Sequence, residues 1–192
     1  MKIAAIADIH CRVTAEDEIA TLLGEVRQSA DLLIIAGDLT DNGQTEEAQL
    51  LVSLLRRLAI PVIAILGNHD HEAGLADEIV ETLTGGGVIV LDGTVYEIGP
   101  IGFAGTKGFC GGFGNCIVQP FGEKALKKFV QVGIEEAINL ENALAKMHCE
   151  HKIVMLHYAP IPDTLEGEPP ELYPFLGSTR FANAVDRQGA DV

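Results

Sequence analysis

The sequence predicts an α/β protein whose first third folds as a parallel β-sheet with connecting helices. Short runs rich in Ile, Val and Leu occur at residues 2–7, 32–36, 62–66 and 152–156. They do not alternate with polar residues, which is typical of strands that are buried on both faces. Between the first three runs, apolar residues recur with a helical period. This strand–helix–strand–helix–strand order predicts parallel strands joined by right-handed crossovers.

The two crossover helices are expected at residues 18–29 and 45–58. Pro61 ends the second helix before the third strand, because proline lacks the N–H that a helix interior needs. The apolar faces are made by Ile19, Leu22, Leu23 and Val26 in the first helix and by Leu50, Leu51, Leu54, Leu55 and Leu58 in the second.

Shorter, antiparallel pieces are expected in the middle of the chain. The dipeptides Asp92-Gly93 and Gly99-Pro100 are typical of tight turns between neighbouring strands. The elements expected here are a helix at 75–83, which ends at three consecutive glycines, and strands at 88–91, 94–98 and 101–105.

A segment rich in glycine and phenylalanine, residues 105–122, is too irregular for a strand and is expected to form a long loop. A long amphipathic helix at 123–147 follows, in which Gly133 costs roughly 1 kcal/mol relative to alanine. Helical spacing returns at 180–187. We expect the glycine-rich loop and residues 160–174 to form the rim of a binding cleft, since both are long and irregular.

Composition restricts the class of protein. The chain has 192 residues, 47% of them hydrophobic, which is enough for one domain with a sizeable core. No apolar run approaches the roughly 20 residues that span a bilayer, and the first residues lack the pattern of a signal peptide, so a cytoplasmic protein is expected. The net charge of -15 disfavours a nucleic-acid surface. All four cysteines are expected to be free thiols, with Cys11 near the chemistry.

Polar side chains follow each of the four buried runs, at the point where the expected strand ends. In open α/β sheets, ligands bind outside the carboxyl ends of the strands, so these side chains should meet in one cleft. They are Asp8, His10, Asp38, Asn68, His69 and His157.

The residue types in this set indicate a metal site. Carboxylates, imidazoles and an amide suit borderline divalent ions such as Mn, Fe, Co or Zn, whereas Mg prefers oxygen ligands. Asp8 and His10 are two residues apart just past a strand, so both can face one ion, and the Asp38 carboxylate can bridge two ions. Two ions about 3.5–4 Å apart form a clamp for displacement at phosphorus and activate a bound water.

Four short motifs occur in an order that resembles the calcineurin-like metallophosphoesterase superfamily. The match extends over nearly the whole chain. The resemblance implies an α/β fold with two packed mixed β-sheets flanked by helices, a four-layer α/β/β/α sandwich. The motifs are D-x-H at Asp8-Ile9-His10, G-D-x-x-D at Gly37-Asp38-Leu39-Thr40-Asp41, G-N-H-D at Gly67-Asn68-His69-Asp70, and the isolated His157.

The resemblance implies five metal ligands for two divalent ions. Asp8 and His10 would bind one ion, Asn68 and His157 would bind the other, and Asp38 would bridge them. Each has a plainer alternative when taken alone. Asp8 and His10 could be polar residues at a strand end, and His157 could be a structural histidine.

The resemblance also implies two catalytic residues. His69 would be the acid near the leaving-group oxygen, and Asp41 would orient it. The alternative for His69 is a structural histidine. Asp41 could instead cap the helix that follows, or do both. Asp70 is expected to be a structural hydrogen-bonding residue.

One family motif, G-H-x-H, does not occur in the sequence. The last residues, Gly189-Ala190-Asp191-Val192, are similar to Ser29-Ala30-Asp31-Leu32, which open the second strand. We therefore expect residues 1–192 to be a single metallophosphoesterase domain that is C-terminally incomplete and stops where a further strand should begin. Such a form is expected to bind metal weakly and to expose a sheet edge through which it self-associates.

A dinuclear metal-dependent phosphoesterase is the function expected from these motifs. It would hydrolyse mono- or diesters of small molecules through a metal-bridging hydroxide. Two alternatives stay open, a non-catalytic interaction module with a vestigial metal site and a nuclease of the same superfamily. Every ligand position up to Val192 is filled, which disfavours the first, and the net charge of -15 disfavours the second.

Overall fold

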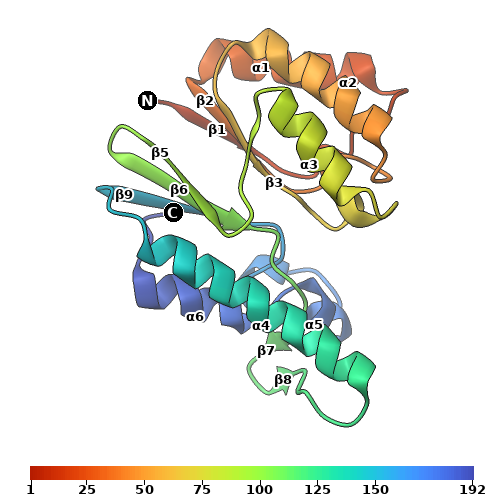
Figure 1. Ribbon diagram of the computed structural model, residues 1–192, viewed down its shortest axis with the longest axis vertical. Coiled ribbons are helices and arrows are strands. Elements are labelled where there is room, and N and C mark those ends of the chain that lie inside the picture. The colour runs from red at the N-terminus through yellow and green to blue at the C-terminus, as the bar shows by residue number, and fades with distance from the viewer. The chain divides into compact units, whose positions relative to one another are not determined.

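The computed structural model describes residues 1–192. It is a mixed α/β structure with several sheets flanked by helices, as expected (Figure 1). The chain divides into two compact units, residues 1–91 and 92–192. Each unit has its own sheet and its own helices.

The first unit contains a four-stranded, wholly parallel sheet in the order β1-β2-β3-β4. The connections between consecutive strands place the three long helices on one face of this sheet (Figure 1). The parallel strands and helices predicted for this part of the chain are confirmed. The elements are β1 (Ile3–Ile6), α1 (Glu16–Ser29), β2 (Leu32–Ala36), α2 (Thr45–Leu55), η1 (Arg56–Leu58), β3 (Val62–Ile65), η2 (His69–His71), α3 (Ala76–Gly85) and β4 (Ile89–Val90).

The core of the first unit lies between the sheet and its helices. Leu33 and Ile35 of β2 pack in one cluster with Leu23 of α1 and Leu51 of α2, and β3 is buried along its whole length. The expectation that β1 is buried on both faces is wrong. This strand is only partly buried and Ala5 is exposed, because β1 is the last strand at its end of the sheet.

The second unit contains a mixed sheet in the order β5-β6-β9. β5 (Thr94–Ile98) and β6 (Ile101–Thr106) pair antiparallel, as expected, and β9 (His151–Leu156) pairs parallel with β6. β9 was expected to be buried on both faces, but it is mostly half-buried. It belongs to the second sheet, because a run of apolar residues does not specify the pairing partner of a strand.

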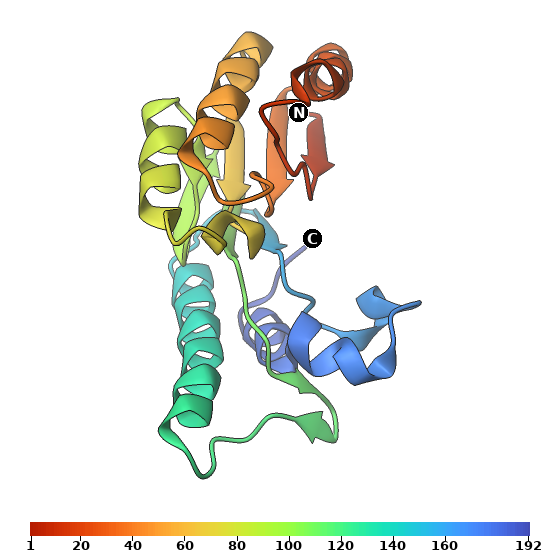
Figure 2. The ribbon, with the colours of Figure 1, turned by 90° about the vertical axis from the view of Figure 1, so that its right-hand side faces the viewer.

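Two helices cover one face of the second sheet, α4 (Lys124–Ala145) and α6 (Thr179–Gln188). They run side by side in Figures 1 and 2. Leu140 of α4 and Phe181 of α6 are fully buried and join one cluster with Ala104 of β6. Both helices were predicted from their apolar spacing and are confirmed.

The glycine-rich segment 105–122 is not a plain loop. It contains the hairpin β7 (Gly112–Phe113) and β8 (Cys116–Ile117), which the sequence pattern missed because each strand has only two residues. The N–H groups of Gly111 and Gly112 donate to the carbonyls of Pro174 and Gly177, both at 2.9 Å. The segment is therefore bonded to the long connection after β9, whose elements are η3 (Pro162–Leu165), η4 (Pro170–Leu172) and α5 (Tyr173–Leu176).

Gly133 has a structural reason for its place inside α4. A Cβ atom at this position would stand 3.0 Å from the carbonyl oxygen of Cys110. The glycine thus lets the glycine-rich segment approach the helix closely, which offsets its poor helix propensity.

The segments 29–32 and 189–192, which are similar in sequence, make the same hydrogen bonds. The Asp31 N–H donates to the Lys2 carbonyl at 2.8 Å, and its carboxylate accepts from the Lys2 N–H at 2.7 Å. The Asp191 N–H donates to the Lys152 carbonyl at 2.9 Å, and its carboxylate accepts from the Lys152 N–H at 2.8 Å. Val192 then bonds along β9 as Leu32 bonds along β1.

Candidate functional site

The connections that follow β1 and β2 run side by side and hold the first candidate residues. The N–H groups of Asp8, His10 and Cys11 donate to the carbonyls of Gly37, Asp38 and Leu39 at 3.1, 2.9 and 3.0 Å. Backbone pairing between these two connections therefore continues past the ends of β1 and β2. It brings the D-x-H and G-D-x-x-D motifs together at one edge of the sheet.

Three of the candidate residues adopt left-handed backbone conformations. The φ angles are 54° at Asp8, 45° at His10 and 49° at Asp38. Non-glycine residues rarely adopt such angles, and each costs on the order of 1–3 kcal/mol. The surrounding hydrogen bonds must supply this energy. Strain of this kind concentrates at functional sites.

Asp38 lies at the centre of this part of the molecule. Its side chain is buried, and its Oδ1 accepts a hydrogen bond of 2.9 Å from the N–H of His69. The carboxylate packs against Gly67, where a Cβ atom would overlap it. Position 67 must therefore be glycine because Asp38 approaches it so closely.

Asp70 ties the connection after β2 to the connection after β3. Its buried carboxylate accepts four hydrogen bonds, two on each oxygen. Oδ2 accepts from the N–H groups of Leu39 (3.2 Å) and Gly67 (2.8 Å). Oδ1 accepts from the N–H (2.8 Å) and the hydroxyl (2.7 Å) of Thr40. The expectation that Asp70 is a structural hydrogen-bonding residue is confirmed.

The side chains of His10, Asp38 and His69 form a cluster of metal-binding type. One donor atom from each lies within 4.8 Å of the other two. His10 Nε2 is 3.6 Å from Asp38 Oδ2, and the two imidazole rings meet edge to face with centroids 4.5 Å apart. His10 Nδ1 is buried without a hydrogen-bond partner. Imidazole and carboxylate donors at this spacing fit a borderline divalent ion.

His69 is oriented by the main chain of Asp41 and not by its carboxylate. Nδ1 of His69 lies 2.7 Å from the carbonyl oxygen of Asp41, so Nδ1 is the ring nitrogen that carries the proton. This hydrogen bond raises the pKa of His69, and the nearby carboxylates of Asp38, Asp41 and Glu72 raise it further. The Asp41 carboxylate instead faces His10, with Oδ1 3.4 Å from Nδ1.

Asp41 does not cap the helix that follows it. Helix α2 begins with a capping box in which Gln44 and Glu47 satisfy each other's backbone N–H groups. Glu47 also accepts from the N–H of Asn42 at 3.0 Å. The helix terminus is therefore satisfied without Asp41, and the capping alternative for this residue is wrong.

Asn68 and Asp8 complete the candidate residues of the first unit. Both side chains are exposed. Asn68 opens the short helix η2 between Gly67 and His69, whose backbone N–H groups are held by Asp70 and Asp38. His157 follows β9 in the second unit and is partly buried. Its convergence with the other ligands stays a prediction.

The four cysteines are free thiols, as expected, but Cys11 is not a reactive one. It is completely buried in the core of the first unit. Burial raises the pKa of the Cys11 thiol to about 11, and the Glu47 carboxylate adds to this rise. Cys11 does lie next to the candidate residue His10, but a thiol with such a pKa stays protonated and inert at neutral pH.

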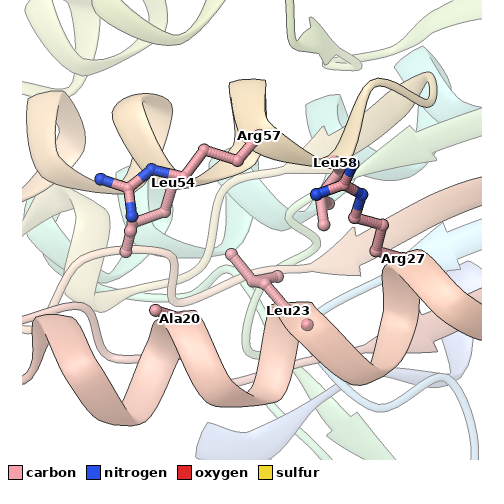
Figure 3. A pocket seen from close by; sticks show the side chains of 7 residues that line it. Ala20, Leu23, Arg27, Leu54, Arg57 and Leu58 are labelled. Carbon is pink, nitrogen blue, oxygen red and sulfur yellow. The ribbon is translucent and has the colours of Figure 1, made fainter.

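A small groove on the first unit lies apart from the candidate residues (Figure 3). Its volume is about 160 Å³, and the arginine side chains of α1 and η1 lie at its two ends. None of the motif residues lines it. The lining residues are Ala20, Leu23, Gly24, Arg27, Leu54, Arg57 and Leu58.

No helix in the structure has both the length and the apolar character that crossing a membrane requires.

Curated relatives match parts of the chain. A probable cyclic nucleotide phosphodiesterase from Synechococcus sp. is 31% identical over 111 residues, which cover 48% of this chain and 44% of that protein. The uncharacterised metallophosphoesterase YkuE from Bacillus subtilis is 35% identical over 104 residues, covering 51% and 34%. A probable glycerophosphodiester phosphodiesterase, GpdQ, from Arcobacter nitrofigilis is 37% identical over 59 residues, covering 31% and 22%. The matches span less than half the length of each relative.

Solved structures share the fold. The Thermus thermophilus protein TT1561 has a TM-score of 0.59 at 15% identity, covering 98% of this chain and 77% of that one. A further crystal structure has a TM-score of 0.59 at 14% identity, covering 99% and 81%. At these identities the likeness concerns the fold alone.

The family is shown by a match over the whole chain. The family model of calcineurin-like phosphoesterases matches residues 1–192. Metallophosphoesterases use divalent metal ions, and the donor chemistry of the His10, Asp38 and His69 cluster fits such an ion. The chain therefore belongs to the calcineurin-like phosphoesterases.

Proposed function

We propose that this protein hydrolyses phosphate esters of small molecules with two divalent metal ions of the Mn, Fe, Zn or Co class. The observation that carries the proposal is that the metal-binding groups of His10 and Asp38 meet beside the imidazole of His69, on connections that Asp70 cross-links. A site of fixed geometry on rigid strand ends is what positioning of a phosphate requires. Family membership supports the reaction class.

The metal ligands in this proposal are those that the motifs indicate. Asp8 and His10 would hold one ion, Asn68 and His157 would hold the other, and the buried Asp38 would serve both. When bound, the ions neutralise charge on the phosphate and activate the attacking water. The left-handed backbone at Asp8, His10 and Asp38 supports this assignment, since strain of this kind collects at functional sites.

His69 acts in the proposal as the proton donor to the leaving-group oxygen. Its Nδ1 is engaged by the Asp41 carbonyl at 2.7 Å, so Nε2 is the ring atom left to exchange a proton. Asp41 thus keeps its proposed orienting role, but through its main chain. Its carboxylate holds the side of His10 that faces away from Asp38, at 3.4 Å.

Phosphate diesters are the substrates to test first. Two of the matched relatives carry names of phosphodiesterases, one for cyclic nucleotides and one for glycerophosphodiesters. Both names describe small diesters. Long nucleic acids fit less well, because a net charge of -15 repels a polyanion.

The experiment measures hydrolysis of bis(p-nitrophenyl) phosphate and p-nitrophenyl phosphate by metal-free protein to which Mn²⁺ is added back. Activity should depend on the metal and should fall at least 100-fold in Asp38→Asn, where the shared carboxylate is lost. The control is Asp77→Asn, which removes an exposed carboxylate from α3 of the same unit. Protein that is folded, holds metal and hydrolyses no ester would refute the proposal and indicate an interaction module.

Self-association is a separate proposal. β9 is the last strand of the second sheet, and Asp191 and Val192 bond to it at Lys152 and Val154. An unpaired stretch of strand edge can accept a strand from a second copy. Sedimentation velocity over a range of concentrations tests this, and a monomer at all concentrations would rule it out.

A further inference from the structure

We propose that Lys107 is a positioning residue for His157, which it fixes through its carbonyl group and through an aromatic pair formed by Phe109 and Tyr158. The proposal rests on the proposed role of His157 as a metal ligand. All the contacts that carry it lie within the second unit.

The main chain of Lys107 holds the turn that carries His157. β6 and β9 are parallel neighbours, and their last residues, Thr106 and Leu156, lie opposite each other. Immediately beyond them, the carbonyl oxygen of Lys107 accepts hydrogen bonds from the N–H groups of both His157 and Tyr158, at 3.1 and 3.0 Å. One acceptor with two consecutive donors fixes where the chain leaves β9. The placement of the His157 backbone therefore depends on the conformation of Lys107.

The side chain of Lys107 stabilises that conformation. Its Nζ donates to the carbonyl of the next residue, Gly108, at 2.9 Å, so the side chain folds back over its own turn. The ammonium group lies 5.0 Å from the ring centroid of Phe109 and 5.3 Å from that of Tyr158. Cations at this distance from aromatic rings are attracted to them, more strongly when partly desolvated. Lys107 is thus held by two rings from two different connections.

The two rings link this cation to the helix layer and to His157. Phe109 packs on Phe129 of α4, with centroids 5.1 Å apart. Tyr158 meets the imidazole of His157 edge to face, with centroids 5.7 Å apart and planes at 88°. The Tyr158 ring therefore touches both Lys107 and His157. A change in the cation is transmitted to the orientation of the imidazole through one rigid side chain.

Gly108 makes this arrangement sterically feasible. Its φ is 80°, and an added Cβ atom would stand 3.1 Å from Cβ of Tyr158. The turn is therefore packed directly against the residue that follows His157. Groups that orient a metal ligand in this way typically matter 10- to 100-fold for metal affinity.

The test compares Lys107→Met and Tyr158→Leu with the wild type and with Lys128→Met, which removes an exposed lysine from α4 of the same unit. Lys107→Met keeps the length of the side chain and the carbonyl acceptor but removes the charge. Two quantities are measured on the full chain, the Kd for Mn²⁺ and the NMR signals of the His157 imidazole in metal-free protein. His157→Gln assigns those signals.

We expect both test variants to weaken Mn²⁺ binding about 10- to 100-fold and to shift or broaden the His157 signals. Lys107→Arg should restore much of the wild-type behaviour, because arginine keeps a cation that packs on aromatic rings. Lys128→Met should change neither quantity. A general loss of folding would instead move the melting temperature and all imidazole signals together, and Lys107→Arg would then not restore the His157 signals selectively.

The two proposals fail in different ways. If His157→Gln leaves Mn²⁺ binding unchanged, the assignment of His157 as a ligand is wrong, and the imidazole signals still decide whether Lys107 positions it. If Lys107→Met and Tyr158→Leu leave those signals and the Kd as in the wild type, the positioning role is refuted.

Discussion

Replacing Asp70 by Asn should loosen the site although it removes no residue proposed to contact a metal or substrate. The carboxylate holds four donors from Leu39, Thr40 and Gly67 with two oxygens. An asparagine side chain offers one oxygen and one NH₂ group in the same space. Two of the four donors must then face another donor.

The orientation of the amide decides the size of the effect. With the NH₂ group on the side of Thr40, the threonine hydroxyl can rotate and accept from it, so only the Thr40 N–H is left without an acceptor. With the NH₂ group on the other side, the N–H groups of both Leu39 and Gly67 lose theirs. The first orientation is therefore favoured. One buried unsatisfied donor costs about 1–3 kcal/mol, and the remaining bonds lose the assistance of the charge, so we expect a total of roughly 2–4 kcal/mol.

The assay is urea unfolding of Asp70→Asn beside the wild type, with Asp77→Asn as the control for a lost exposed carboxylate on α3. The same proteins are tested for Mn²⁺ affinity and ester hydrolysis, and both should weaken at least ten-fold in Asp70→Asn. The reason is that the Leu39–Thr40 and Gly67 connections carry Asp38 and His69. A change in the free energy of unfolding below about 0.5 kcal/mol, the range of neutral surface substitutions, would refute the reasoning.

Three further outcomes are expected. Gly67→Ala should impair metal binding and destabilise the protein by about 1–3 kcal/mol, because the new methyl group overlaps the Asp38 carboxylate. The control is Gly85→Ala, whose methyl group meets nothing within 4 Å and which should be neutral or stabilising in urea unfolding. The free energy of unfolding should fall as pH rises from about 9 to about 11, because the pKa of the Cys11 thiol is 9.0 in the unfolded chain and about 11 in the folded protein. This loss amounts to at most about 3 kcal/mol, and a Cys11→Ala variant with the same pH dependence would contradict it. Gly133→Ala should not give the roughly 1 kcal/mol gain usual in a helix, since the added Cβ stands 3.0 Å from a backbone carbonyl; a clear rise in melting temperature would show that the contact relaxes freely.

The local elements of the fold could be predicted because their signals are local. The strands at 32–36 and 62–66 and the helices after them follow from apolar runs and helical spacing in short windows. Such short stretches of sequence do not specify which other strand a given strand pairs with. β9 has the same kind of apolar run as β2, yet it pairs with β6 and is only half-buried. The hairpin β7–β8 was missed for a related reason, since two-residue strands depend on contacts with distant residues.

In the candidate site, too, some features follow from local sequence and others depend on long-range contacts. The residue types and their positions after strands were enough to predict a set of candidate side chains, because the carboxyl ends of parallel strands meet at one edge. The contacts that hold these side chains in place could not be predicted from the sequence. Asp41 reaches His69 through its carbonyl oxygen, and Gly67 is required by the carboxylate of Asp38. Both contacts join residues about 30 positions apart.

The sequence by itself determined the order of strands and helices apart from the hairpin β7–β8, the family and the set of candidate side chains, because each is encoded in apolar spacing or in short motifs along the chain. Only the tertiary structure decided the left-handed backbone at Asp8, His10 and Asp38, the four bonds that converge on Asp70, and the complete burial of Cys11. The physical reason is that hydrogen bonding and burial depend on neighbours in space. Those neighbours come from separate strands, and no local pattern specifies the distance or direction at which they meet.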